Sequence, residues 1–583
     1  MVKRHFTRVL ALAVSLLIAP AHGRDTTPSV PSSDAAVASA HPVATEAGIE
    51  ILTAGGNAFD AAIAVAATLA VVEPTGSGLG GGGFFLLHRN DGDHNVMVDA
   101  REMAPANASE TMYLDSNGMP VPQASIDGPL AAGIPGLAAG LAHLASRYGR
   151  LPLRKSLAPA IRAAWDGFAV DQRYVGMAAW RQNALKKSPE AARIFLRDGA
   201  PPPVGMLLKQ PDLAGVLERL GDQGHDGFYR GLTAQQLVEG VRHGGGIWTQ
   251  DDLAEYRVIE RAPVMGQYRD VRVISAAPPS SGGVALIASL NMLQAYNLDR
   301  VATADRIHLI VESMRRAYHD RALYLGDPDF VSVPVERLIH PLYAEGLRAT
   351  LQLNRATPST VFIAAPPVPS GPSTTHLSVL DAEGNRVAAT LSINLPFGAA
   401  HVAPGTGILL NNEMDDFSIK PGTPNAYGLI GAQANAIAPK KRPLSSMTPT
   451  FLESPTRVGI LGTPGGSRII SMVLLGTLEF AAGRGPEQWV GIKRFHHQFW
   501  PDVIQWESGA FEPGIVTTLT ERGHHLDEQA QPYGNMQAIL FDKTTGRASA
   551  ASDPRGIGSS KVIAAVMSKA STPNRVQTTG PVH

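Results

Sequence analysis

One threonine in the sequence lies where a break in the chain would make it a nucleophile. The stretch 357–373 carries five prolines and no regular hydrophobic spacing, so we expect an exposed connector there. From Thr374 onward polar and apolar residues alternate, residues 381–385 form a turn sequence, and the alternation resumes at 387–393, which predicts a β-hairpin. If the bond between Ser373 and Thr374 is cut, the new α-amine of Thr374 can serve as the base for its own hydroxyl. The alternative is that this threonine merely opens a strand.

Residues that could bind a charged ligand are found on both sides of this threonine. The segment 411–417 (NNEMDDF) holds three acids between apolar stretches. Because it has no histidine and no regularly spaced ladder of acids, it fits a substrate ammonium better than a metal ion. Arg101 follows a strand predicted at 96–99 and could bind a carboxylate through two parallel hydrogen bonds, although a lone arginine at such a place is more often part of a surface ion pair.

Two further segments could contribute to a site for an anion. Gly465 and Gly466 lie between a predicted strand and a predicted helix, and glycines at such a turn can point backbone N–H groups at an oxyanion. This motif is weak by itself, because many turns contain paired glycines. The segment 441–449 places two serine hydroxyls next to basic residues. The loop 421–428, which we expect to be exposed, carries one tyrosine that could serve as a lid.

The elements that must position these groups follow from hydrophobic periodicity. A helical pattern covers 41–72 with a Gly-Gly-Asn break at 55–57, and Thr303 is placed to cap a helix over 303–320. The glycine run at 78–83 follows a helix and precedes a strand, so it does not match a phosphate-binding loop. Further helices are predicted within 129–166, 207–229, 234–244 and 469–480, and further strands at 84–88, 96–99, 271–276 and 458–462.

Composition limits the classes of function. The chain has 583 residues, of which 44% are hydrophobic and 17% charged, which is typical of a globular protein with a large core. A net charge of −1 argues against a nucleic-acid partner. The absence of cysteine excludes thiol catalysis and cysteine-bound metal. The adjacent pairs His496–His497 and His524–His525 do not favour a metal site either, because neighbouring side chains of a strand point to opposite faces.

Residues 1–23 read as a secretory signal peptide. Lys3, Arg4 and Arg8 form a basic start, an apolar run covers 9–18, and small residues precede a cut before Arg24. We therefore expect a periplasmic or secreted protein without a membrane span once the signal is removed. An uncleaved membrane anchor is the alternative.

Five longer motifs carry a resemblance to a known family. They are DAREMAP (99–105), TTHLSVLDAEGN (374–385), GILLNNEMDDFS (407–418), KKRPLSSMTPT (440–450) and GTPGGSR (462–468). With them the chain resembles, from about residue 35 to about residue 560, the γ-glutamyltransferases (γ-glutamyltranspeptidases, glutathione hydrolases), which are N-terminal-nucleophile hydrolases.

The resemblance implies an architecture. The family makes a precursor that cuts itself, here between Ser373 and Thr374. Residues 24–373 would become the large subunit and 374–583 the small, catalytic subunit, which pair as a heterodimer. The implied fold is α+β, a four-layer αββα sandwich built jointly by both subunits as one intertwined domain.

The resemblance also implies roles for single residues, and it implies no cofactor and no metal. Thr374 would be the nucleophile. Ser392 stands where the family usually has a threonine that steadies the nucleophile; the serine keeps the hydroxyl and loses a methyl group, so we expect function with some loss of rigidity. The other roles are carboxylate binding by Arg101, Ser445 and Ser446, ammonium binding by Asn394, Glu413 and Asp416, the oxyanion hole at Gly465 and Gly466, and the lid at Tyr427.

The implied reaction is transfer of a γ-glutamyl group. Thr374 would form an ester from glutathione or another γ-glutamyl amide, and water or the amine of an amino acid or dipeptide acceptor would resolve it. Two alternatives are a cephalosporin or glutaryl acylase, whose substrate lacks the α-ammonium, and an unprocessed, inactive binding relative. Glu413 and Asp416 argue for an ammonium-bearing substrate, because two acids that face no cation would be costly. The proline-rich sequence before Thr374 leaves the rate of processing open.

Overall fold

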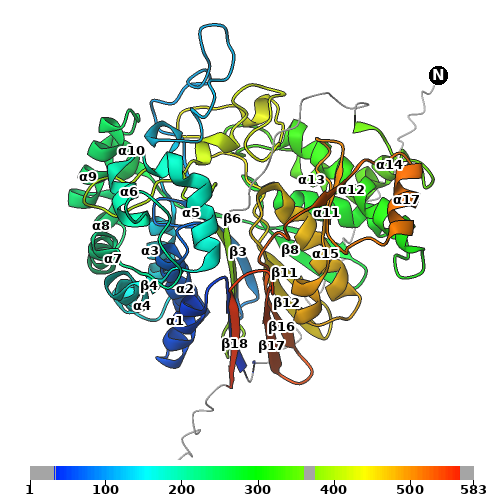
Figure 1. The fold of residues 1–583 in the computed structure, drawn as a ribbon. Coiled ribbons are helices and arrows are strands. Elements are labelled where there is room, and N and C mark those ends of the chain that lie inside the picture. Colours follow the sequence, from blue (N-terminus) through cyan, green and yellow to red (C-terminus); the bar gives the residue numbers. More distant parts are fainter. Residues whose placement is uncertain (1–31, 33, 360–373, 565–583) are drawn as a thin grey trace, which may run out of the picture.

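The computed structural model describes residues 32, 34–359 and 374–564. Two β-sheets stack in its centre, and helices cover the outer face of each (Figure 1). This is the predicted α+β, four-layer αββα sandwich, so the predicted fold is confirmed. The proposed signal peptide and the proposed cleavage residue Ser373 lie outside the described residues.

The first sheet has seven strands in the order β18-β1-β9-β10-β2-β3-β6. The predicted hairpin lies in its middle, where β9 and β10 pair antiparallel with Thr375 opposite Leu391. The strands are β1 (Asp34–Ser39), β2 (Gly82–Arg89), β3 (His94–Ala100), β6 (Ile259–Arg261), β9 (Thr375–Leu380), β10 (Arg386–Ser392) and β18 (Ser559–Ala564). Both faces of this sheet are covered: Phe85 and Leu87 pack against the helices, while Phe84 and Leu86 pack toward the second sheet.

The second sheet has six strands in the order β17-β16-β12-β11-β8-β7. They are β7 (Val264–Tyr268), β8 (Val271–Ser275), β11 (Thr450–Glu453), β12 (Arg457–Gly462), β16 (Gln537–Asp542) and β17 (Arg547–Ser552). Both large sheets therefore take strands from before and after Thr374, and the two parts of the chain share one core. Two small sheets accompany them, one of β13 (Phe495–His496), β14 (Ile504–Glu507) and β15 (Leu526–Gln529), and one of β4 (Phe168–Ala169) and β5 (Leu207–Leu208).

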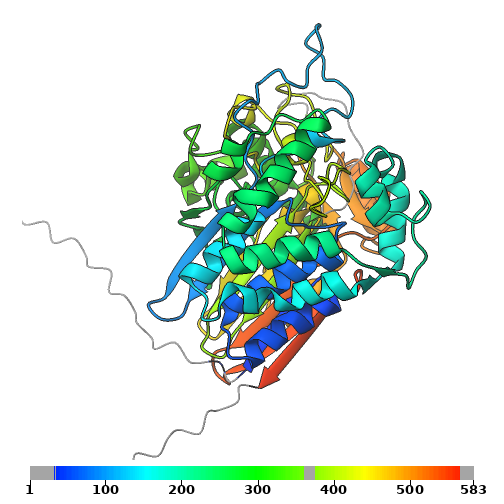
Figure 2. The same ribbon diagram turned by 90° about the vertical axis from the view of Figure 1, so that its left-hand side faces the viewer.

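The helices between residues 42 and 255 form one outer layer, which faces the viewer in Figure 2. Its alanine-rich α2 is buried along its whole length, as a helix without a polar face must be. The predicted break at 55–57 is observed, because Asn57 caps α2 in a capping box with Asp60. The helices are α1 (Pro42–Thr53), α2 (Ala58–Val72), α3 (Leu137–Arg147), α4 (Leu153–Asp166), α5 (Gln172–Leu185), α6 (Pro189–Phe195), α7 (Pro211–Gln223), α8 (Asp226–Tyr229), α9 (Gly231–His243) and α10 (Gln250–Glu255).

The later helices form the other layer, and its longest member is α12 (Thr303–Tyr324). The prediction that Thr303 caps this helix is wrong: Ala302 is the N-cap and makes no side-chain bond. The expectation of one helix over 207–229 is also wrong. The helix begins only at Pro211, which is favoured at a first helical position, and Leu207–Leu208 form a short strand. The remaining helices are α11 (Gly282–Leu293), α13 (Val335–Leu338), α14 (Pro341–Arg348), α15 (Ile469–Ala481), α16 (Pro486–Gly491) and α17 (Pro513–Glu521).

The start of the predicted connector is anchored rather than exposed. The Thr357 N–H and hydroxyl donate to Glu312 on α12, and the Ser359 N–H donates to Asp502 at 2.7 Å. Ser359 is fully buried. The expectation of an exposed stretch is therefore wrong for these residues, and 360–373 lie outside the described part of the chain.

Candidate active site

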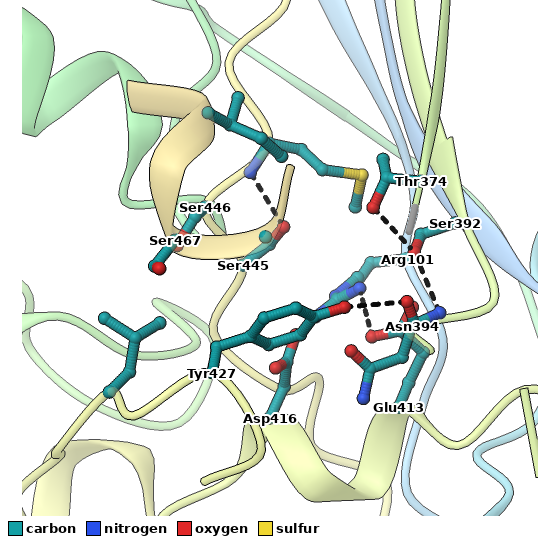
Figure 3. A pocket seen from close by; sticks show the side chains of 14 residues that line it. Arg101, Thr374, Ser392, Asn394, Glu413, Asp416, Tyr427, Ser445, Ser446 and Ser467 are labelled. Atoms are coloured by element: carbon teal, nitrogen blue, oxygen red, sulfur yellow. Dashed lines mark hydrogen bonds and ion pairs between the residues drawn. The ribbon is translucent and has the colours of Figure 1, made fainter. Parts of the chain in front are cut away.

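A pocket of about 290 Å³, open mouth included, lies where the first residue of the hairpin meets the second half of the chain (Figure 3). It brings together all the predicted site residues except Ser373, which is outside the described chain, and Gly465, which stands behind Gly466. Its lining comprises Arg101, Thr374, Ser392, Asn394, Glu413, Asp416, Tyr427, Leu429, Ser445, Ser446, Met447, Gly466, Ser467 and Ile469.

Thr374 directly precedes β9, whose side chains alternate between the two faces of the first sheet. Leu377 and Val379 pack toward the first helical layer. Side chains one residue out of phase face the second sheet, as Ser378 shows by donating to Gln537 O at 3.2 Å. Thr374 lies just before the first residue of β9, and its side chain lines the pocket between the two halves of the sandwich.

Among the described residues, the Thr374 hydroxyl has one side-chain partner. Its Oγ1 lies 3.2 Å from Ser392 Oγ at the end of β10, and Ser392 Oγ also accepts the Asn394 N–H at 2.8 Å (Figure 3). The side chain is 3% exposed. Thr374 has φ +105°, a region that a β-branched residue rarely adopts.

Asn394 connects this hydroxyl pair to the far wall of the pocket. It turns the chain out of β10 in the left-handed region, at φ +71°, and its Nδ2 donates to Asn412 O at 2.9 Å. Its carbonyl accepts the Tyr427 hydroxyl at 2.7 Å. One hydrogen-bonded chain therefore runs from Thr374 through Ser392 and Asn394 to Tyr427.

Arg101 and two acids form the first end of the pocket. Arg101 follows β3, and its Nη1 donates to Glu413 at 2.7 Å and its Nη2 to Asp416 at 2.6 Å. Both acids lie on the short 3₁₀ helix Glu413–Asp416. Arg101 is 1% exposed, so the alternative of a surface ion pair is wrong. The expectation that Glu413 and Asp416 face no cation without a substrate is also wrong, because Arg101 already supplies one.

Burial and mutual repulsion raise the pKa values of Glu413 and Glu102. Burial raises the pKa of Glu413 well above its usual range, and the charges of Glu102 and Asp416 add to that effect against the opposing attraction of Arg101. Burial likewise raises the pKa of Glu102 to about 7. One guanidinium thus lies among three carboxyl groups, and this end of the pocket is rich in acid.

Serines form the opposite end. Ser445 Oγ accepts the Met447 N–H at 3.1 Å, and Ser446 Oγ accepts a hydrogen bond from Arg321 Nη2 at 3.2 Å. No acid lines this side of the pocket among the described residues. The sequence analysis did not identify Arg321. The available signal was weak: an arginine one helical turn after Tyr318 in a long helix.

The glycine turn lies beside these serines. Gly465 has φ +143° and Gly466 has φ +56°, and neither N–H donates to an acceptor within the described part of the chain. A Cβ on Gly466 would collide with the ring of Tyr427, and one on Gly465 would lie 2.6 Å from the methyl group of Met472. Both positions therefore require glycine. The hydroxyl of Tyr318 on α12 donates to the Ser467 carbonyl and fixes the turn from behind.

Tyr427 lies across the pocket and is 4% exposed, so the expectation of an exposed loop is wrong at this residue. Its carbonyl accepts the Gln498 Nε2–H at 3.1 Å, and its ring lies against Gly466. Burial raises its pKa well above the ordinary value, so the hydroxyl remains a neutral donor to Asn394.

The histidines that follow α16 are core residues. His496 bonds to Ser471 at 2.8 Å and His497 to Asp502 at 3.2 Å. Burial lowers their pKa values to about 3 and about 4.

One group in the described chain has the spacing of a metal site, formed by His308, Glu312 and His524. The carboxylate of that group is already bound by Arg315 and Arg316, and its two rings bond to each other at 2.8 Å.

A buried threonine at the head of a central strand, in a sandwich of two sheets between two helical layers, defines the class of N-terminal-nucleophile hydrolases. The family model "Gamma-glutamyltranspeptidase" matches residues 44–563. The chain is 40% identical over 529 residues to the glutathione hydrolase proenzyme of Escherichia coli, which covers 89% of this chain and 90% of that protein. The chain therefore belongs to the γ-glutamyltranspeptidase family, and the resemblance is confirmed.

Solved structures agree with this family. A cephalosporin acylase from Bacillus halodurans superposes with a TM-score of 0.79 at 28% identity, covering 94% of this chain and 99% of that one. A γ-glutamyltranspeptidase from Helicobacter pylori has a TM-score of 0.54 at 41% identity, over 55% of this chain and 92% of that one. In the described residues, the helices are all too short or too polar to cross a membrane.

Proposed function

We propose that this protein is a self-processing γ-glutamyltransferase and glutathione hydrolase. The observation that carries the proposal is the Thr374 hydroxyl, which faces a pocket lined by acids at one end, by serines at the other and by Gly466 of the glycine turn. A γ-glutamyl group is a zwitterion with an acyl carbonyl at the far end of its side chain. It needs a nucleophile, an oxyanion hole and one partner for each charge.

Maturation comes first. The Thr374 Oγ attacks the Ser373 carbonyl carbon, the C–N bond breaks, and the hydroxyl proton goes to the released amine. Water then cleaves the ester and leaves a carboxylate on Ser373 and a free α-amine on Thr374. The left-handed φ of Thr374 supports this step, because a strained peptide gains free energy on cleavage.

Turnover uses the same hydroxyl. The new α-amine has an ordinary pKa near 8, so it can act as a base close to neutral pH. Thr374 attacks the γ-carbonyl of the donor, the oxyanion is held by the N–H groups of Gly465 and Gly466, and the amine of the donor (Cys-Gly from glutathione) leaves. Water then gives glutamate, or an amino acid or dipeptide gives a new γ-glutamyl amide.

Donor recognition uses groups from both ends of the pocket. We assign the α-carboxylate to Arg101, Ser445 and Ser446. The α-ammonium is assigned to Asn394, Glu413 and Asp416. Because Arg101 is bound to both acids, the ligand has to compete with these ion pairs for its partners at the acid end.

A glutaryl or cephalosporin acylase is the second candidate, and one contact favours it. Arg101 neutralises Glu413 and Asp416, so these acids do not by themselves demand a substrate ammonium. The two functions separate on a pair of donors. A γ-glutamyltransferase cleaves γ-glutamyl-p-nitroanilide much faster than glutaryl-p-nitroanilide, which lacks only the α-ammonium, and an acylase shows the reverse preference.

The first experiment tests self-cleavage. Intact mass and N-terminal sequencing of the parent should show a small subunit that begins at Thr374, paired with a large subunit that ends at Ser373. Thr374→Ala should remain one chain and be inactive on γ-glutamyl-p-nitroanilide. Thr375→Val is the matched control. The Thr375 side chain is equally buried but does not line the pocket, so this variant should be cut and active. A processed, active Thr374→Ala protein would refute the proposal, and a parent that stays as one chain would favour an inactive relative.

The proposal includes a heterodimer of residues 24–373 and 374–583 in the periplasm or outside the cell. Support for the pairing comes from the first sheet, in which β1 lies between β18 and β9, and β2 lies next to β10. Neither part could close its core without the other.

A further inference from the structure

Arg321 is a buried cation that forms no ion pair with a carboxylate in the described chain. It lies near the end of α12 and is 5% exposed. Its Nε donates to Ser281 Oγ at 2.9 Å and its Nη2 to Ser446 Oγ at 3.2 Å. Within the described residues, the side chain of Arg321 therefore donates to neutral hydroxyls, and burying a full positive charge without an acid is ordinarily costly.

The other buried arginines show how unusual this is. Arg468 also has no carboxylate partner among the described residues, but it stacks on Tyr533 and donates to the side-chain oxygens of Gln505 and Gln529. The remaining ones each pair with an acid: Arg101, Arg181, Arg315, Arg316, Arg386, Arg442 and Arg494. Among the buried arginines of the described chain, Arg321 is thus the one with neither an acid nor an aromatic or amide partner, and it donates to a serine that lines the pocket.

The hydrogen bonds of Arg321 lead to the serine wall. Because Ser446 Oγ accepts from the guanidinium, its own hydroxyl proton is left to donate, and Ser446 lines the pocket. Ser281 receives the second bond, and both its hydroxyl and its N–H donate to the Ser445 carbonyl, at 2.6 and 2.8 Å. Ser445 Oγ accepts from the Met447 N–H, so its proton is also left to donate. Two hydroxyls are thus set as donors toward an anion.

Arg101 is differently placed, because its charge is already in use. The carboxylate that acts on Arg321 at longer range is Asp416, and Asp416 is bound to Arg101 at 2.6 Å. The charges around the pocket are therefore uneven: acid is in excess around Arg101, and behind Ser446 lies a cation without a carboxylate partner in the described chain.

We propose that Arg321 is a positioning residue for donor specificity: the ligand α-carboxylate is its missing counter-ion, reached through the hydroxyls of Ser446 and Ser445. This rests on the proposed function for the identity of the donor. Arg321 does not touch the ligand. It aligns the two hydroxyls and supplies the positive potential that makes a carboxylate the preferred group at that wall.

The test compares donors with and without the carboxylate. γ-Glutamyl-p-nitroanilide carries it, and 4-aminobutyryl-p-nitroanilide keeps the ammonium and lacks it. For Arg321→Met we expect kcat/KM on the first donor to fall about 10- to 100-fold, mostly through KM, and on the second to change less than about 2-fold. Arg321→Lys keeps a cation at the site and should retain most of the preference for the carboxylate.

Two controls distinguish a general loss of stability from a loss of preference for the carboxylate. Arg316→Met removes a buried, ion-paired arginine from the same helix, and its mature form should lose stability without a change in the ratio between the two donors. Ser446→Ala should lower that ratio, and the double variant Arg321→Met/Ser446→Ala should lose little beyond either single variant, because both act on one contact. Equal losses of Arg321→Met on both donors, or additive losses in the double variant, would overturn the proposal.

A separate measurement tests the proposed function. The parent's preference for γ-glutamyl over glutaryl-p-nitroanilide tests the donor class, since these two share the carboxylate and differ in the ammonium. If the glutaryl donor wins, the proposed function fails. Arg321 is then judged on glutaryl against butyryl anilide, where the same selective loss is expected and an equal loss refutes its role.

Discussion

The two ends of the pocket are built on opposite principles. At the acid end, Arg101 is held between Glu413 and Asp416, so the site groups satisfy each other before any ligand arrives. At the serine end, Ser445 Oγ and Ser446 Oγ accept hydrogen bonds from the Met447 N–H and from Arg321, so their own protons are left for a ligand. Arg321 has no carboxylate partner in the described chain. The first end must rearrange its ion pairs to bind, whereas the second is pre-organised. A zwitterionic ligand suits both, because it brings an ammonium to the end rich in acid and a carboxylate to the end rich in cation.

The difference also assigns different costs to the two ends. Breaking an ion-pair cluster inside a protein exposes buried charges, so changes at the acid end should affect stability as well as activity. The serine end depends on hydroxyl orientation and on a turn whose glycines fit against Tyr427, so changes there should act on turnover and specificity. The predictions below test this division, beginning with the largest expected effect.

Arg101→Met should be the most damaging change at the acid end. It leaves Glu102, Glu413 and Asp416 buried together without their cation. We expect kcat/KM on γ-glutamyl-p-nitroanilide to fall about 10³-fold and the free energy of unfolding at pH 8 to fall by about 3 kcal/mol. Part of the stability should return at pH 5, because protonation removes the repulsion between the carboxylates.

Arg261→Met is the matched control for that change. It removes a partly buried guanidinium from Asp99 and Asp329, outside the pocket. It should lower the melting temperature and leave kcat/KM within about 2-fold. If Arg101→Met retains the kinetics of the parent, the acid end does not bind the donor, and the division between the two ends is lost.

The sequence predicted the parts of the site that local pattern determines. Alternation and a turn sequence located the hairpin and therefore Thr374, and the acid-rich segment located Glu413 and Asp416. It could not show that Arg101 joins these acids across more than 300 residues of chain, since that contact depends on how the two sheets stack. For this reason the expectation that Glu413 and Asp416 face no cation without a substrate ammonium is wrong.

Arg321 was missed for a related reason. On a helix an arginine is usually exposed, and its burial here depends on the packing of α12 against the serine segment and the glycine turn. Tyr318 and Arg321, one turn apart on α12, reach Ser467 and Ser446 respectively. Tyr427 likewise read as an exposed loop residue, because its partner Asn394 belongs to another segment.

Gly466→Ala tests the serine end by displacing Tyr427. The added Cβ would collide with the tyrosine ring, and φ +56° is unfavourable for alanine. We expect kcat to fall about 10²-fold on γ-glutamyl and 4-aminobutyryl anilides alike, because the oxyanion hole serves both donors. Stopped-time assays with each donor at saturation measure the effect.

A comparison at another glycine separates collision from backbone strain. Gly483 has φ +86°, and a Cβ there meets no atom within 4 Å, so Gly483→Ala carries strain alone. It should cost some stability and leave kcat unchanged. A selective loss on the γ-glutamyl donor with Gly466→Ala would instead place Gly466 in donor recognition and would shift specificity away from Arg321.

The smallest effect is a dependence of specificity on pH at the acid end. Burial raises the pKa of Glu102 to about 7, so this carboxyl is neutral at pH 6 and ionised at pH 8. Ionisation adds negative charge beside Arg101 and favours a ligand ammonium. The ratio of kcat/KM for γ-glutamyl over glutaryl-p-nitroanilide should therefore rise about 3- to 10-fold from pH 6 to pH 8.

The titration of the Thr374 amine cancels in this ratio, and the donor ammonium stays charged over that range. Glu102→Gln should flatten the profile; if the ratio still rises in that variant, another carboxyl group, with Glu413 the first candidate, sets the charge of the acid end.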